Sequence, residues 1–167
     1  KGDLVYLIGK SHNDINSSQY LVSYHGVEQS PAPYFNLEEE AELHKVVRHM
    51  CHHGFVNSAH DCADGGLFIT LLEKALAGNL GFDITTPAEI RKDAFLFGEA
   101  QGRVVVTVSQ DQEEAFTDMI SLTDNKFSLL GHITKGELRV DDQSFGFIEE
   151  WRSLYEGGLE KNLAERS

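Results

Sequence analysis

Short apolar runs alternate along this chain with longer stretches in which apolar residues recur every three or four positions. The first pattern is typical of buried strands and the second of amphipathic helices. The clearest strand is 103–108, because it contains four nearly continuous valines, and β-branched residues favour strands. We expect strands at 4–8, 55–59, 81–84, 103–108, 127–133 and 137–140.

Helix signals stand between these strands. Asn36 is a suitable N-cap, and three glutamates follow it where the positive end of the helix dipole favours negative charge. Gly65-Gly66 opens a second helix with an apolar stripe. We expect helices at 37–53, 87–97 and 111–122, a helix that the Gly65-Gly66 turn opens and Gly78 stops, and a helical tail from 147 that docks on the core. The segment 19–24 is ambiguous, and Ser17 or Ser18 could cap a helical turn there.

The order of elements predicts the fold class. Strands and helices alternate, and 127–133 and 137–140 are expected to pair as a hairpin around Lys135-Gly136, which together indicate an α/β or α+β protein. The 167 residues fit a single domain, 1–167, and 41% apolar residues suffice for a core. No apolar stretch is long enough for a membrane span. The missing initiator Met suggests an excerpt of a longer chain.

The charge narrows the possible ligands. The formal net charge of −13 disfavours nucleic acid, because the surface repels phosphate, and an anionic substrate would need local backbone N–H groups or cationic side chains. Only Cys51 and Cys62 are present, which do not make a disulfide framework. Two reduced thiols are typical of a cytoplasmic protein.

The run from Ser58 to Gly66 is the first candidate site. Two glycines before a helix let a ligand approach the backbone, and the helix start offers free N–H groups to an anion. Asp61 and Asp64 would repel a phosphate unless Mg²⁺ bridges them. Asp64 has an equally simple interpretation as the helix cap, and both remain open.

Two other stretches have polar groups in suggestive patterns. Glu99, Gln101 and Arg103 precede a buried strand and could converge on a ligand, although a solvated turn with an edge salt bridge is the simpler interpretation. His49 and His53 have the i, i+4 spacing of helical metal ligands. Histidines also complement the dipole at a helix C-terminus, so no metal site is predicted. The remaining members of this histidine and cysteine group are His44, Cys51, His52, His60 and Cys62.

These motifs follow one another in a specific order. The order is Ser58-Ala59-His60-Asp61-x-x-Asp64-Gly65-Gly66-Leu67, then Gly81-Phe82-Asp83-Ile84, then Leu96-Phe97-Gly98-Glu99-x-Gln101-Gly102-Arg103. It resembles the C-terminal domain of the aminoimidazole ribonucleotide synthetase superfamily. Within that superfamily it is most similar to the second copy in the formylglycinamidine ribonucleotide synthases, from Gly2 to about Trp151.

The resemblance implies a three-layer α/β/α domain with a mixed, partly ferredoxin-like sheet. It implies an ATP-dependent C–N ligase of purine biosynthesis, which uses ATP and Mg²⁺ and glutamine-derived ammonia to convert formylglycinamide ribonucleotide to the amidine. The partners implied are the ATP-binding domains of the same chain, a glutaminase subunit and a small structural subunit. The catalytic histidine would lie upstream of Lys1, so we expect no catalytic residue here and no activity or cofactor in the isolated domain.

Two departures from the family pattern bear on the site. Ala63 stands where the family usually has Ser, and Gly98-Glu99-Ala100 stands where it has Ser-Glu-Ser, so hydroxyl donors for a phosphate are missing. The expected phosphate contacts, at an auxiliary or interdomain site, are Asp61, Asp64, Gly65, Gly66, Glu99, Gln101 and Arg103. The alternatives are a domain of a sister enzyme, such as thiamine-monophosphate kinase or a hydrogenase maturation factor, and a purely structural scaffold.

Overall fold

The computed structural model describes residues 1–164 of the 167-residue chain. Its strands are β1 (Leu4–Ile8), β2 (Ser58–Asp61), β3 (Gly81–Ile84), β4 (Val104–Val108), β5 (Phe127–Thr134), β6 (Glu137–Val140) and β7 (Gln143–Phe147). Its α-helices are α1 (Leu37–His53), α2 (Gly66–Gly78), α3 (Lys92–Phe97), α4 (Glu113–Ser121) and α5 (Ile148–Ala164). Two short helical segments lie at Tyr20–Tyr24 and Gln110–Gln112. None of the described helices is both long and apolar enough to cross a lipid bilayer.

The seven strands form one mixed sheet in the order β2-β4-β1-β5-β3-β6-β7. The predicted hairpin of β5 with β6 is wrong, because β3 lies between them, antiparallel to β5 and parallel to β6. The turn at Lys135-Gly136 therefore carries the chain across β3 to its other side. β6 pairs instead with β7, a strand that the sequence patterns do not predict.

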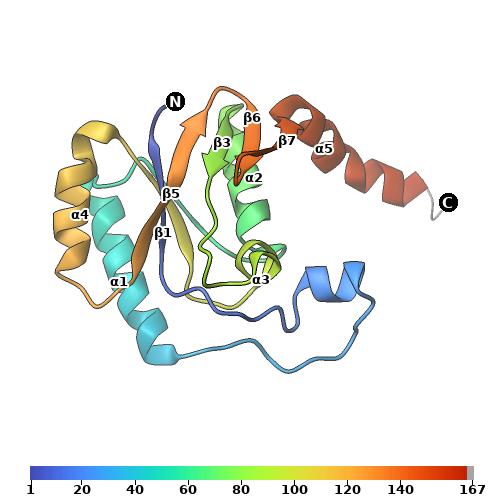
Figure 1. The fold of residues 1–167 in the computed structure, drawn as a ribbon, viewed down its shortest axis with the longest axis horizontal. Coiled ribbons are helices and arrows are strands. Elements are labelled where there is room, and N and C mark those ends of the chain that lie inside the picture. The colour runs from blue at the N-terminus through green and yellow to red at the C-terminus, as the bar shows by residue number, and fades with distance from the viewer. Residues whose placement is uncertain (165–167) are drawn as a thin grey trace.

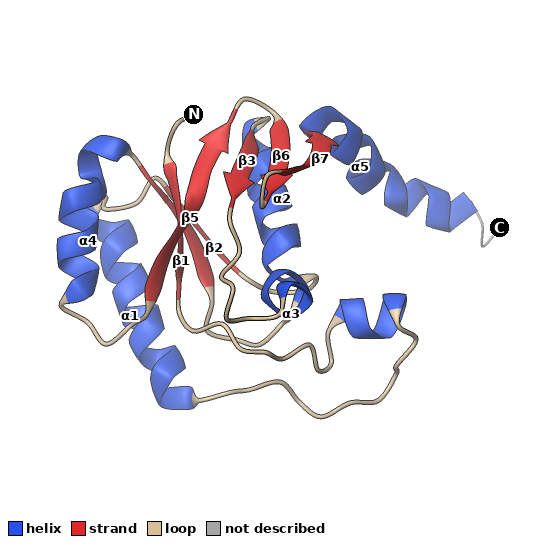
Figure 2. Cartoon of the chain, in the orientation of Figure 1, coloured by secondary structure: helices blue, strands red, loops and turns tan. Residues whose placement is uncertain are grey.

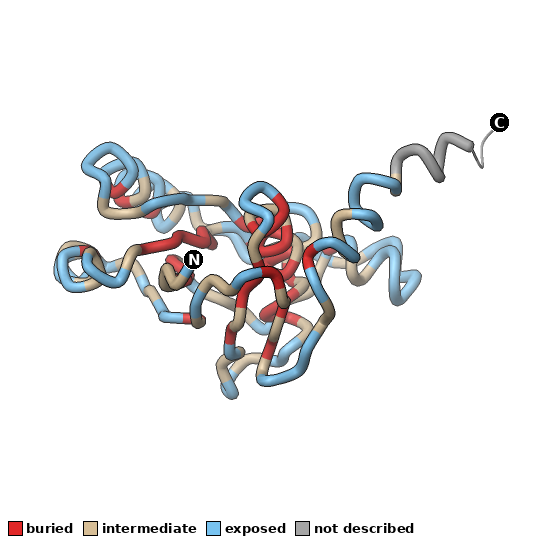
Figure 3. The backbone as a smooth tube through the Cα atoms, turned by 90° about the horizontal axis from the view of Figure 1, so that it is seen from above, coloured by how far each residue is buried: buried red, intermediate tan, exposed pale blue. Residues whose placement is uncertain are grey.

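Helices cover both faces of the sheet, which confirms the predicted α/β class with three layers (Figure 1). Helices α2 and α3 pack on one face against β1, β3, β4, β5 and β6. Helices α1 and α4 pack on the other face, mainly against β1 and β4. Figure 3 shows the buried segments running between these layers. β1 and β4 are buried on both faces, which explains why their sequences are almost continuously apolar.

The helix ends show which local signals the fold uses. The Asn36 side chain accepts hydrogen bonds from the N–H groups of Glu38 and Glu39, so the predicted N-cap of α1 is confirmed. Gly54 ends α1 in the left-handed conformation with φ of 71°. After it, the strand predicted at 55–59 is displaced to β2 at Ser58–Asp61, because the Phe55 N–H bonds back to the Met50 carbonyl and closes the helix end.

The chain between β1 and α1 is a long loop interrupted only by the helical turn Tyr20–Tyr24 (Figure 2). The N-cap residue of this turn is Gln19, but the predicted contact of Ser18 is present, since its Oγ accepts the Leu21 N–H at 3.2 Å. The Tyr20 ring stacks on Phe97 of α3 with centroids 4.9 Å apart, which brings the loop beside the end of α3.

The tail docks on the core along its first half. Ile148 is completely buried, and the Trp151 indole N–H donates to the Phe145 carbonyl at 2.7 Å. Tyr155 is 51% exposed, but its hydroxyl donates to Oε1 of Glu73 in α2 at 2.6 Å, so the predicted docking includes this residue. Leu154 remains 70% exposed, and the prediction is wrong for it.

Candidate functional site

The glycine turn at the start of α2 lies at the centre of the candidate site. Gly65 and Gly66 have φ of 83° and 70°, left-handed values that favour glycine. The Gly65 N–H donates to Oε1 of Glu99 at 2.8 Å, and the Gln19 N–H donates to the same oxygen at 2.8 Å. The Glu99 carboxylate therefore already binds one of the N–H groups that the sequence predicts for an anionic ligand, and it places a negative charge beside the others.

Asp61 and Asp64 both face solvent beside this turn. The interpretation of Asp64 as a side-chain cap is wrong, because Gly65 is the N-cap residue and no side chain caps α2. The turn closes instead through the backbone, with the Gly66 N–H donating to the Ala63 carbonyl at 3.0 Å. The Asp64 carboxylate is thus left available to solvent and ions, while Oδ1 of the exposed Asp61 lies 3.4 Å from Nδ1 of His60.

Arg103 does not reach the surface of the site. Its side chain is buried, with Nη1 donating to the Phe95 carbonyl at 2.8 Å and Nη2 donating to the Gly98 carbonyl. Burial lowers the pKa of Arg103, and burial raises the pKa of the neighbouring Cys62 thiol. The predicted edge salt bridge of a solvated turn is therefore wrong: Arg103 holds the last turn of α3, and through it the position of Glu99.

Close backbone packing connects the two predicted stretches. A Cβ atom added at Gly66 would lie 2.7 Å from the Gly98 carbonyl oxygen and 2.9 Å from the Leu96 oxygen. One added at Gly98 would lie 2.4 Å from the Asp14 carbonyl oxygen. The structure thus brings Gly65, Gly66 and Glu99 together, with Arg103 behind them.

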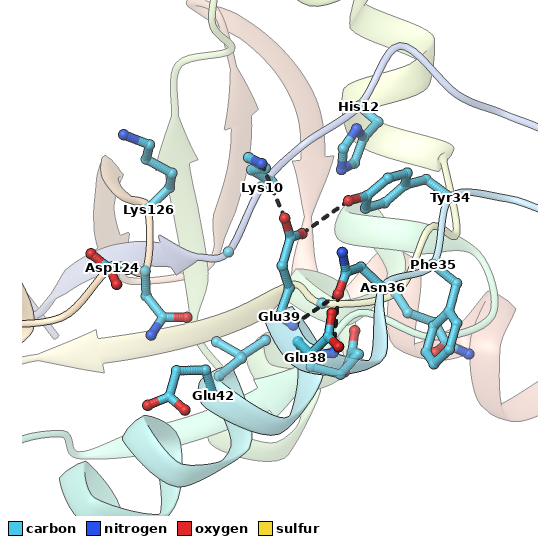
Figure 4. Close-up of a pocket in the computed structure, with 16 residues that line it drawn as sticks. Lys10, His12, Tyr34, Phe35, Asn36, Glu38, Glu39, Glu42, Asp124 and Lys126 are labelled. Carbon is cyan, nitrogen blue, oxygen red and sulfur yellow. Dashed lines mark hydrogen bonds and ion pairs between the residues drawn. The ribbon is translucent and has the colours of Figure 1, made fainter.

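A groove of about 380 Å³ lies between the end of β1, the start of α1 and the loops that precede β4 and β5. Figure 4 shows Glu39 at its centre, where one carboxylate oxygen pairs with Lys10 Nζ at 3.2 Å and the other accepts the Tyr34 hydroxyl at 3.3 Å. The His12 ring stacks on Tyr34 with centroids 4.2 Å apart. Gln101 lines this groove rather than the glycine turn. Its lining also includes Glu38, Glu40, Glu42, Asp124 and Lys126, so it is predominantly acidic.

Sequence patterns missed the residues of the long loop that complete the site. Asp14 accepts the Asn16 N–H at 2.8 Å and the Tyr34 N–H at 3.0 Å, and so shapes the loop beside the glycine turn. Gln19 contributes only a backbone N–H, for which any residue except proline would serve. No pattern of side chains could have indicated that contact.

These features define an α/β domain in which a mixed sheet presents a glycine turn at the start of a buried helix. The chain belongs to the family described as AIR synthase related protein, C-terminal domain, whose model matches residues 1–143. A curated relative, the phosphoribosylformylglycinamidine synthase subunit PurL of Moorella thermoacetica, is 34% identical over 131 residues, covering 78% of this chain and 18% of the relative. The same subunit from Nostoc sp. is 35% identical over 176 residues, covering 98% and 22%. The chain thus spans about a fifth of the length of these relatives.

Solved structures agree on the fold. The structure of Thermotoga maritima PurL complexed with FGAR has a TM-score of 0.73 with 15% identity, covering 89% of this chain and 27% of that chain. T. maritima PurL complexed with ATP has a TM-score of 0.64 with 14% identity, covering 89% and 25%. Thiamine-monophosphate kinase from Stenotrophomonas maltophilia has a TM-score of 0.58 with 18% identity, covering 86% and 51%. At these identities the likeness shows a common fold and nothing more.

Proposed function

We propose that this chain is a domain of a phosphoribosylformylglycinamidine synthase of the PurL type. In that reaction ATP phosphorylates the formyl amide oxygen of formylglycinamide ribonucleotide, and ammonia then displaces phosphate to leave the amidine. The supporting observation is the 35% identity to a PurL subunit over 98% of the chain. The sister-enzyme alternative has only a likeness of fold in its favour, since the thiamine-monophosphate kinase is 18% identical. The proposed location is the cytoplasm.

The remainder of the same polypeptide is the first proposed partner. Six apolar side chains of the segment 22–37 are substantially exposed, although Tyr24 stacks on Tyr20 and Tyr34 stacks on His12, and exposed apolar surface marks an interaction site. They are Val22, Tyr24, Val27, Tyr34, Phe35 and Leu37, between 39% and 76% exposed. A glutaminase subunit and a small structural subunit are the further partners proposed, and the solved structure described as PurLQS from T. maritima is a complex in which a PurL chain has other subunits.

The glycine turn is proposed to serve an auxiliary or interdomain site, not the reacting centre. Asp61 and Asp64 would hold Mg²⁺, because a magnesium ion is commonly bound by one or two carboxylates together with phosphate oxygens and water. The ion would neutralise the carboxylates next to a nucleotide phosphate. Glu99 and Arg103 would then position the turn. The proposed contacts with the ligand are Asp61 and Asp64. The N–H groups of Gly65 and Gly66 already donate to Glu99 and to the Ala63 carbonyl, and Gln101 lines the groove instead.

The activity is tested on the full-length polypeptide with ATP, Mg²⁺, formylglycinamide ribonucleotide and ammonium salt. We expect ammonia-dependent formation of the amidine and of ADP, and no reaction with the 167-residue chain. Phosphorylation of thiamine monophosphate without amidine formation would favour the sister enzyme and refute the proposal.

The role of the turn is tested separately by calorimetry with Mg-ADP. Asp64→Asn should weaken the binding of nucleotide to the auxiliary site while leaving turnover at the reacting centre within about twofold. Asp118→Asn, in α4, is the matched control. Nucleotide binding that is unchanged in Asp64→Asn and in Asp61→Asn would favour the structural-scaffold alternative, because the turn would then touch no ligand.

A further inference from the structure

Two histidines at the C-terminal end of α1 face each other on the protein surface. His49 and His53 are one helical turn apart and both exposed. Their ring centroids lie 4.1 Å apart with an angle of 34° between the ring planes. This proximity is the arrangement in which two imidazoles can share one ion as ligands from consecutive turns of a helix.

A backbone contact determines which nitrogen of His53 is free. Its Nδ1 lies 2.9 Å from the His49 carbonyl oxygen. Because a carbonyl oxygen only accepts hydrogen bonds, Nδ1 must carry the proton, and in the neutral ring Nε2 keeps its lone pair. Histidines that bind metals usually donate their second N–H in this way to a carbonyl or carboxylate, which orients the ring.

The surroundings of the pair favour a cation. The Phe55 ring stacks beside His49 with centroids 6.0 Å apart, which limits the movement of that imidazole. The pair lies in the last turns of a 17-residue helix, where the dipole is negative, and the chain carries a net charge of −13. Within the described residues no group of three or more His, Cys, Asp or Glu side chains could hold a metal ion, so protein ligands other than these two are not part of the site.

We propose that His49 and His53 form a bidentate surface site for a divalent transition metal that prefers imidazole, such as Ni²⁺ or Zn²⁺. The two imidazoles supply two ligands and water supplies the rest. The site lies on α1, away from the glycine turn of α2, and the proposal does not depend on the proposed function.

The experiment is a calorimetric titration of the full-length polypeptide with NiCl₂ in the absence of nucleotide. Cys51→Ser is used as the background, since Cys51 is an exposed thiol on the same helix and would otherwise compete for the metal. We expect that His49→Gln and His53→Gln each abolish the binding of one Ni²⁺ ion per polypeptide, or weaken its affinity at least about tenfold. Removal of a mere hydrogen-bond partner of a metal ligand already costs about that much, and loss of a ligand should cost no less. His44→Gln, earlier on α1, should change nothing.

Circular dichroism of each variant checks the fold, and glutamine is a good helix former at these exposed positions. The proposal is overturned if the background protein binds no Ni²⁺, or if either His49→Gln or His53→Gln binds it as tightly as the background. It is also overturned if His44→Gln loses the same equivalent, because the binding would then belong to histidines in general and not to this pair.

Discussion

Single side chains in this domain act largely through the backbone groups they satisfy. Glu99 binds two backbone N–H groups, and Arg103 binds two backbone carbonyls at the end of α3. Both were candidates for ligand contact from their position before a strand. The structure adds the reason for their residue types: a buried carbonyl needs a donor, and an N–H at a helix start is stabilised by an anion.

Lys74 is a residue whose charged form is destabilised by burial in the folded state. Its Nζ donates to Ser58 Oγ at 2.6 Å, and Ser58 Oγ shares a 2.6 Å hydrogen bond with Thr107 Oγ1. Burial lowers the pKa of Lys74 to about 8. Because the unfolded chain keeps this amine protonated to a pH of about 10.4, the folded state releases the proton first as the pH rises.

The protonated Lys74 lowers the free energy of unfolding, so this free energy should rise between about pH 8 and about pH 10, where the folded state has lost the proton and the unfolded chain has not. Lys74→Met eliminates the titration, so the difference in free energy of unfolding between wild type and variant should move in favour of the wild type across this range. Urea denaturation at several pH values measures it. Using the difference cancels the opposite contribution of Cys62, whose pKa is raised. A difference that is flat from pH 7.5 to pH 10 would contradict the assignment.

At the scale of elements, the join of β1 to β4 sets the shape of the site. Gly9 follows β1 with φ of 101°, and a Cβ atom there would lie 1.7 Å from the Gly102 carbonyl oxygen. This contact brings the groove, which Gly9 and Gly102 both line, next to the segment 98–103 that carries Glu99. Glycine was recognisable in the sequence as a strand boundary, but the sequence contains no sign that it touches Gly102, 93 positions later.

Gly9→Ala should therefore destabilise the fold severely, by more than about 3 kcal/mol, because a backbone clash adds to the strain of positive φ. Gly26→Ala is the matched control: its φ of 68° is also left-handed, but nothing lies within 4 Å of the added Cβ. That variant should cost about 1 kcal/mol. Chemical denaturation of both variants makes the comparison, and equal costs would show that the close approach to Gly102 is unimportant.

At the scale of the whole molecule, exposed apolar side chains gather in one stretch of the sequence. Six of them lie between Val22 and Leu37, in the long loop and at the first residue of α1, while those on the sheet and the other helices, such as Leu129 and Phe147, are scattered along the chain. A domain that spans about a fifth of its relatives' length is expected to meet other parts of a polypeptide, and this segment is the surface suited to it.

Hydroxyl-radical footprinting of the full-length polypeptide tests this expectation. Tyr24 and Phe35 should be oxidised several-fold more slowly than their exposure of 76% and 56% in this domain would allow. Leu122, 89% exposed at the end of α4, is the control and should react freely. Rapid oxidation of Tyr24 and Phe35 would place the contact with the remainder of the chain elsewhere.

The sequence by itself determined the elements whose signals are local. The cap at Asn36, the glycine that ends α1 and the apolar run of β4 each depend on residues a few positions apart, and the structure confirms them. The order of the glycine motifs was enough to indicate the family.

Only the tertiary structure decided which distant segments meet. The insertion of β3 between β5 and β6 depends on pairing among strands separated by some 50 residues, which no hairpin signal at Lys135-Gly136 could reveal. The binding of Glu99 to Gly65, the burial of Arg103 and the placement of Gln101 in the groove follow from how α2 and α3 pack on the sheet. Unlike the local cap at Asn36, hydrogen bonds to backbone groups that are distant in the sequence leave no signature in side-chain patterns, so the sequence showed these residues but not their partners.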